Sequence, residues 1–134
     1  MEDNYVSFEN CKLLKQFGFE QNYYWNPVWW MNGNHPQLSF DGDSDFPYGD
    51  NVCCGCTNAE ALKFLRERYG LNVEILIAGL VERPDIPVKW KYRIYDSVNN
   101  IDYGSATIFD TYEQTEGASI SHCLFILNKK ESDN

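Results

Sequence analysis

The segment that decides the fold runs from residue 88 to residue 95 and reads Val-Lys-Trp-Lys-Tyr-Arg-Ile-Tyr. Its apolar positions Val88, Trp90, Tyr92 and Ile94 alternate with the basic positions Lys89, Lys91 and Arg93. Because successive side chains of a β-strand point to opposite faces of a sheet, this alternation predicts a strand with one apolar face and one basic face.

The neighbouring segments extend this strand into a three-stranded meander. Residues 72–81 are nearly all apolar, which predicts a central strand covered on both faces. Residues 82–87 contain two prolines and predict a turn. Asn99-Asn100 predicts a tight turn into a third strand at about residues 101–109.

An earlier strand pair is indicated between residues 23 and 40. The aromatic segment 23–31 predicts a strand, and Pro27 predicts an edge position or a bulge within it. Asn32-Gly33 is a strong hairpin signal, so residues 37–40 are predicted to be the returning strand. Residues 41–56 are rich in Asp, Gly and Pro and predict a loop.

Three helices are expected. The first spans about residues 8–17, with Ser7 as its cap and Gly18 as its left-handed end residue. The second begins at a capping box formed by Thr57 and Glu60 and ends at Gly70. The third starts with Asp110 as cap. Residues 118–127 also fit a strand, although the helix is preferred, and residues 128–134 predict a polar, frayed tail.

This order of elements predicts the α+β class, with a mainly antiparallel sheet (a hairpin plus a three-stranded meander) and two to three helices packed on one face. The chain has 134 residues, which fits a single domain covering residues 1–134 with a polar tail at about 129–134.

Composition and charge restrict the setting in which the protein acts. No run of eighteen apolar residues occurs, and the N-terminus lacks the basic start of a secretory signal, so a cytoplasmic protein is expected. The 5 cysteines are an odd number, which fits thiols in a reducing compartment. The formal net charge of −9 disfavours direct binding to nucleic acid or to an anionic membrane.

The acidic charge is concentrated in residues 1–60, where nine acids face only Lys12 and Lys15. The candidate acidic loop consists of Asp41, Asp43, Asp45 and Asp50. Its opening resembles a calcium loop, but Phe46 and Val52 stand where such a loop needs Gly and Glu, so a solvated loop is preferred. The charge distribution supports one hypothesis for function, an acidic nucleic-acid mimic that inhibits a host defence protein.

Aromatic residues supply a candidate binding patch at Tyr24, Trp25, Trp29 and Trp30. Tryptophan and tyrosine dominate the binding energy of protein interfaces. A hydrophobic face packed on helices explains the same residues, and we prefer that explanation. On a strand, however, Trp29 and Trp30 point to opposite faces, so one of them is predicted to lie outside the core.

The cysteine cluster Cys53, Cys54 and Cys56 is a candidate zinc site. Cys11, Cys123, His35 or His122 would supply the remaining ligand. No second pair of ligands has a specific spacing, so structural thiols are preferred, and no cofactor is expected unless zinc binds. A zinc-stabilised module is therefore a second alternative for the function.

A catalytic function has little support in the sequence, and the chain is expected not to be an enzyme. His122 and Cys123 are adjacent, and adjacent residues of a helix point about a hundred degrees apart, which is unsuited to sharing a proton. The sequence holds no glycine-rich phosphate loop, nucleophile elbow or metalloprotease motif.

Four segments resemble small uncharacterised proteins encoded by phages and prophages of anaerobic gut bacteria. They are residues 5–19 (Tyr-Val-Ser-Phe-Glu-Asn-Cys-Lys-Leu-Leu-Lys-Gln-Phe-Gly-Phe), 59–71 (Ala-Glu-Ala-Leu-Lys-Phe-Leu-Arg-Glu-Arg-Tyr-Gly-Leu), 89–95 (Lys-Trp-Lys-Tyr-Arg-Ile-Tyr) and 109–113 (Phe-Asp-Thr-Tyr-Glu). The resemblance covers about half the chain and keeps the order of elements. It implies an origin in a mobile element and brings no catalytic or ligand residues with it.

The preferred hypothesis is a non-catalytic accessory protein of a phage or mobile element that acts by binding another protein. A homo-oligomer is an open possibility, in which the basic row Lys89, Lys91 and Arg93 pairs with the acidic first half of another copy.

Overall fold

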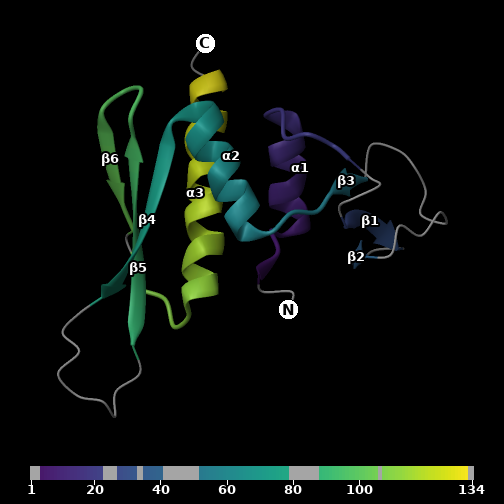
Figure 1. The fold of residues 1–134 in the computed structure, drawn as a ribbon, viewed down its shortest axis with the longest axis horizontal. Helices are drawn as coiled ribbons and strands as arrows, with labels where there is room; N and C mark the ends of the chain where they lie inside the picture. The colour runs from purple at the N-terminus through teal and green to yellow at the C-terminus, as the bar shows by residue number, and fades with distance from the viewer. Residues whose placement is uncertain are drawn as a thin grey trace. The chain divides into compact units, whose positions relative to one another are not determined.

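The structure is a computed structural model, and it describes residues 4–22, 27–32, 35–40, 52–78, 88–105 and 107–132. The chain forms two compact units, Met1–Thr57 and Asn58–Asn134 (Figure 1). The described residues contain three helices and two three-stranded antiparallel sheets, which confirms the predicted α+β class.

The first helix of the unit Met1–Thr57 is α1 (Phe8–Gln16), which begins at the predicted residue and ends one residue before the predicted Phe17. The Ser7 side chain accepts a hydrogen bond from the backbone N–H of Asn10, which satisfies one of the unpaired donors of the first turn. Gly18 has a φ of 102°, and the Phe19 N–H returns to the Leu14 carbonyl at 2.8 Å. This geometry ends the helix, because only glycine adopts such a φ without strain.

The sheet of this unit has the order β2-β1-β3, formed by β1 (Val28–Asn32), β2 (His35–Ser39) and β3 (Cys53–Cys54). The prediction that Pro27 sits at an edge or in a bulge is wrong. Pro27 precedes the central strand, and its carbonyl accepts the Gly55 N–H at 2.6 Å. The returning strand begins at His35, two residues earlier than expected, and the edge strand β2 carries Pro36. Gly33 of the predicted turn lies outside the described residues.

The assignment of Cys53–Cys54 to a loop is also wrong. Cys53 pairs with Trp29 and Cys54 pairs with Val28, so these two residues form the short third strand. The pairing partners lie more than twenty residues upstream. A local hydrophobic pattern carries no signal for a pairing of this kind, because two residues are too few to show a period.

The unit Asn58–Asn134 contains α2 (Asn58–Tyr69), β4 (Leu71–Ala78), β5 (Lys89–Asp96), β6 (Ile101–Gly104) and α3 (Tyr112–Ser132). Its strands have the order β4-β5-β6, which confirms the predicted meander. Both helices lie on one side of this sheet, with α2 against β4 and α3 against β5 and β4 (Figure 1).

The prediction that the strand within residues 72–81 is the central strand of its sheet is wrong. β4 is an edge strand, and Glu74 and Ile77 are exposed on it. The central strand is β5, where Tyr92, Ile94 and Asp96 are buried between exposed neighbours, as the alternation predicts. The third strand is shorter than expected and ends at Gly104, and Phe109 then forms an isolated bridge with Trp90.

Helix α3 settles the ambiguity of residues 118–127 in favour of the helix and corrects both of its predicted ends. Thr111, and not Asp110, caps the helix, since its hydroxyl accepts the Gln114 N–H at 3.0 Å. Asp110 instead pairs with Lys89 on β5. The helix continues to Ser132, so residues 128–132 are helical and not a frayed tail.

Buried residues of α2, α3 and the sheet form the core of the second unit. They are Ala61, Leu65, Leu71, Ile94, Ile120, Cys123 and Leu124. Among the described helices, none combines the length and the apolar content needed to cross a lipid bilayer.

Candidate functional site

Two polar contacts hold α3 alongside β5. The hydroxyl of Tyr92 lies 2.8 Å from Nδ1 of His122, and Nζ of Lys130 lies 2.6 Å from Oδ2 of Asp96. Four strand residues span about 13 Å and eight helix residues span about 12 Å, so the two contacts match in spacing. Helix and strand therefore run in the same direction with a fixed register.

Asp96 is a fully buried carboxylate at the end of β5. Besides Lys130, it accepts hydrogen bonds from the backbone N–H groups of Val98 and Asn99 and from the Asn99 side-chain amide, at 2.9–3.1 Å. Burial pushes the pKa of Asp96 upward, but the hydrogen bonds from Asn99 and Lys130 outweigh burial and hold the pKa below its ordinary value. The charged carboxylate thus fixes the β5–β6 turn and the end of α3 together.

His122 lies between two tyrosine rings. The ring centroids of Tyr92 and Tyr103 are each 5.6 Å from the imidazole centroid in edge-on arrangements. Burial lowers the pKa of His122, because the imidazolium form loses solvation there. Burial also raises the pKa of Tyr92, with a smaller contribution from Cys123. His122 is therefore a neutral imidazole at neutral pH, and its Nδ1 is occupied by a fold contact.

A groove of about 270 Å³ opens next to this pair, between β6 and α3. We call it the α3–β6 groove, and it is lined by Tyr103, His122, Phe125, Ile126, Lys129 and Lys130. The helix residues recur at spacings of three and four, so they share one face of α3. Phe125 is 63% exposed, more than Phe40, Tyr95 and Tyr112, the other exposed aromatic residues of the described chain.

The charge of the α3–β6 groove is positive. Lys130 is paired with the carboxylate beneath it, whereas Lys129 makes no ion pair with any residue in the described part of the chain. Among the described residues, no carboxylate lines the groove. An exposed ring beside an uncompensated ammonium group is suited to a ligand that carries both an apolar group and an anion.

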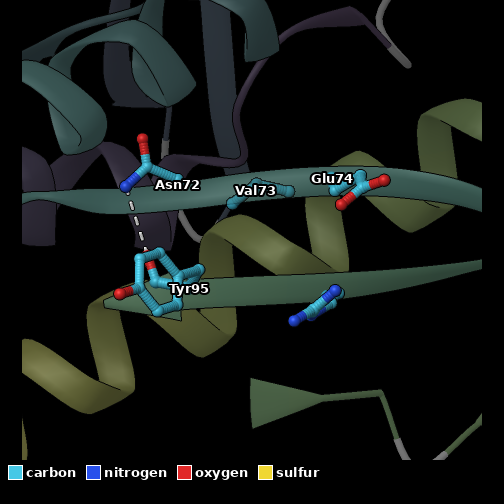
Figure 2. A pocket seen from close by; sticks show the side chains of 5 residues that line it. Asn72, Val73, Glu74 and Tyr95 are labelled. Carbon is cyan, nitrogen blue, oxygen red and sulfur yellow. Dashed lines mark hydrogen bonds between the residues drawn. The ribbon is translucent and has the colours of Figure 1, made fainter. Parts of the chain in front are cut away.

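The outer face of the same sheet offers a second hollow, of about 410 Å³, lined by Asn72, Val73, Glu74, Arg93 and Tyr95. Figure 2 shows these side chains on β4 and β5, with the ribbon of α3 behind the strands and the Asn72 amide directed at the Tyr95 carbonyl.

The cation that lines this hollow is compensated by neighbouring carboxylates. The Arg93 guanidinium donates to both carboxylate oxygens of Asp102, at 2.8 Å and 3.0 Å, and this pair holds the pKa of Asp102 below its ordinary value. Glu74 lies opposite Arg93 on the neighbouring strand. Because Arg93 is already paired and exposed pairs of this kind contribute little, the α3–β6 groove, with its exposed Phe125 ring and the Lys129 ammonium group, is the stronger candidate site.

The predicted aromatic patch is only partly within the described residues, since Tyr24 and Trp25 lie outside them. Trp29 and Trp30 are both half-buried. The indole N–H of Trp29 donates to the Val6 carbonyl at 3.0 Å, and that of Trp30 donates to the Ser39 hydroxyl at 2.8 Å. Both indoles thus have a structural role inside the unit Met1–Thr57, and a role in partner binding stays a prediction.

The candidate acidic loop of Asp41, Asp43, Asp45 and Asp50 lies outside the described residues. The cysteine cluster is described, and Cys53, Cys54 and Cys56 are buried free thiols. Burial, reinforced by neighbouring Cys11, raises the pKa of Cys53 to about 12, and burial raises that of Cys54 to about 11. Among the described residues, no three His, Cys, Asp or Glu side chains are grouped so that they could hold a metal ion.

His122 and Cys123 point to different surroundings, as their adjacency on a helix predicts. His122 contacts Tyr92, whereas Cys123 is buried in the core, where burial raises its thiol pKa to about 12. The structure therefore does not bring the pair together as nucleophile and base.

The groove residues were not identified as a site from the sequence. One signal was present, because Phe125 falls outside the apolar stripe formed by Ile120, Cys123, Leu124 and Leu127. An aromatic residue outside the core stripe of a helix is a candidate contact residue. The sequence predicts a polar tail for the segment that holds Lys129 and Lys130. It therefore does not show that they lie on the same face of α3 as Phe125.

The chain matches no protein-family model, no curated protein and no solved structure in comparisons with all three.

Proposed function

We propose that this protein is a cytoplasmic accessory protein of a phage or mobile element that acts by binding another protein, and that the α3–β6 groove is its binding surface. The observation that carries this proposal is the exposed ring of Phe125 in a hollow that also presents Lys129. The sequence resemblance to phage and prophage proteins supports the proposed origin.

Exposed aromatic side chains cost solvation energy unless a partner covers them. A fully buried Phe side chain gains about 1.5–3 kcal/mol relative to an exposed one, so covering Phe125 would supply a substantial part of a binding energy. Tyr103, which is half-buried, also lines the groove, and the nearly buried Ile126 forms part of its floor. An aromatic anchor in a hollow with a charged rim is the arrangement typical of binding hot spots.

The lysines of the groove give the partner a defined polarity. Lys129 and Lys130 both line it, and the buried carboxylate of Asp96 compensates only the second. A partner that offers a carboxylate beside an apolar side chain is therefore favoured. The same charge selects against a basic partner surface, since like charges brought together in an interface are repulsive.

The test is affinity capture of partners from a bacterial lysate, followed by binding measurements with the purified partner. Replacing Phe125 by Ser should weaken binding roughly tenfold or more, because truncating a central aromatic anchor costs about 2 kcal/mol. Replacing Lys129 by Glu should weaken it further and remove most of its salt dependence.

The matched control is Ile108→Ser, because Ile108 is 60% exposed and does not line the groove. This variant should bind as the unmodified protein does. The proposal is wrong if Phe125→Ser and Ile108→Ser bind the purified partner equally well while both keep the unfolding midpoint of the parent chain.

A further inference from the structure

Strand β6 is the edge of its sheet on the side of the α3–β6 groove. It pairs with β5 from Ile101 to Gly104, and within the described residues no strand pairs with its other side. An unpaired edge presents a row of backbone N–H and C=O groups that a further strand can bind.

The direction of these backbone groups follows from one hydrogen bond. The Ser105 N–H donates to the Tyr92 carbonyl at 3.1 Å. Tyr92 and Ser105 are therefore a hydrogen-bonded pair of the antiparallel ladder between β5 and the chain that follows β6. Residues of an antiparallel edge strand alternate between bonding inward and facing outward. Tyr103 and Ile101 therefore bond to β5, whereas the backbone groups of Asp102 and Gly104 point away from the sheet.

Two features keep this edge accessible. The strand carries neither proline nor lysine, the residues that commonly block sheet edges, in contrast to β2 with its Pro36. A methyl group on Gly104 would meet nothing within 4 Å, and Gly104 does not have a positive φ. Nothing at Gly104 therefore blocks the approach of a further strand, and an added methyl group would leave this edge open.

The side chains next to this edge form the groove already described. Tyr103 projects from β6 to the face that carries α3, beside Phe125, and Lys129 lies one turn of α3 further on. A strand added to β6 would place every second side chain over these residues. Its backbone would take the hydrogen bonds of Asp102 and Gly104, and its side chains would fill the groove.

We propose that β6 and the α3–β6 groove together bind an extended segment of a partner protein as a fourth strand, with an apolar and a carboxylate side chain two residues apart. This proposal rests on the proposed function and specifies how the partner binds. The apolar side chain covers Phe125 and Tyr103, and the carboxylate pairs with Lys129. Strand addition to an exposed edge is an established mode of peptide recognition.

The charges disfavour a second copy of the chain as the occupant. Pairing β6 with β6 would bring together two grooves that each carry Lys129 and Lys130 and, in the part of the chain that the structure describes, no carboxylate. Such a pairing offers no carboxylate to Lys129 of either copy and adds repulsion between the two grooves.

The test uses the full chain and a displayed library of random twelve-residue peptides. Enriched peptides should share an apolar and an acidic residue separated by one position, and one of them is then measured by fluorescence anisotropy. Gly104→Pro removes an N–H that points outward and keeps the bonds to β5, so it should weaken binding roughly tenfold or more. Gly104→Ala is the matched control and should bind unchanged, because it keeps the N–H.

Amide hydrogen exchange on the unmodified chain gives an independent measurement. Saturating peptide should slow the exchange of the Asp102 and Gly104 amides, while the inward-bonded Tyr103 amide is already protected. If peptide binds and Phe125→Ser weakens it while these two amides stay fast, strand addition is wrong and the groove remains the binding surface. If no peptide is enriched, or if the chain only pairs with itself through β6, the strand-addition proposal is overturned.

Discussion

Nζ of Lys130, on the last turns of α3, lies 2.6 Å from Oδ2 of Asp96, a carboxylate without solvent exposure at the end of β5. Lys130 also lines the α3–β6 groove, so its ammonium group joins the groove to the buried charge. The same carboxylate accepts three further hydrogen bonds from the turn that leads into β6. One buried charge therefore fixes both walls of the α3–β6 groove.

Replacing Asp96 by Ala should lower the free energy of unfolding by about 2–4 kcal/mol, because it leaves buried donors without an acceptor. Replacing Lys130 by Met should cost less, about 1 kcal/mol, since the lysine is partly exposed and the turn still provides donors to the carboxylate. Urea unfolding at pH 7 measures both. A loss below 1 kcal/mol in Asp96→Ala would contradict the assigned role.

The lowered pKa of Asp96 also predicts a pH dependence. Since its folded-state pKa is below the ordinary value of 3.8, the stabilisation is fully present above that value and is lost as the pH falls through the folded-state pKa. The unfolding midpoint of the unmodified chain should therefore fall in this acid range. Asp96→Asn should lack this component of the fall, and an identical profile in the two proteins would refute the prediction.

The lowered pKa of His122 predicts a second pH dependence of the stability, at higher pH. Burial lowers its folded-state pKa below the ordinary 6.5, so the unfolded chain binds the proton more readily. The stability associated with His122 is present above pH 6.5 and declines as the pH falls from there to the folded-state pKa. His122→Gln keeps a polar partner for Tyr92 without this titration, so its stability should change less between pH 7 and pH 5.

The sequence predicts the elements that depend on neighbouring residues, and it misses the features that depend on residues distant in the chain. The period of two in residues 88–95 and the signals at Ser7 and Gly18 are local, and each predicted its element. Pairing of Cys53 with Trp29 and the edge position of β4 depend on residues distant in the chain, so no local pattern contains them. The groove needs Tyr103 and Phe125 from two elements, and the sequence shows only that Phe125 falls outside the apolar stripe of its own helix.

The buried thiols should react slowly in the folded protein. Only the thiolate is nucleophilic, and burial raises the pKa of Cys53 and Cys123 to about 12 and that of Cys54 to about 11. At pH 8 an aromatic disulfide reagent should therefore label these thiols slowly until denaturant is added, and then label all 5 cysteines. Rapid labelling of the folded chain would show that the thiols are accessible.

Substitution by alanine is expected to change the free energy of unfolding in opposite directions at two glycines. Gly70 joins α2 to β4 with a φ of 70°, and a methyl group there would lie 2.7 Å from Oγ of Ser97 and 2.9 Å from Val98. Gly70→Ala should therefore cost about 1–3 kcal/mol through backbone strain and crowding. Gly117 lies within α3, where a methyl group meets nothing within 4 Å.

Gly117→Ala should accordingly raise the free energy of unfolding by about 0.5–1 kcal/mol, because alanine restricts the unfolded chain and favours the helix. Chemical denaturation of the two variants beside the parent chain measures both changes under one set of conditions. The pair tests the turn at Gly70 specifically, since any general effect of an added methyl group would move both variants in the same direction. A destabilised Gly117→Ala would mean that residues 112–132 do not form one continuous helix, and with it the face that carries Phe125 and Lys129 would be lost.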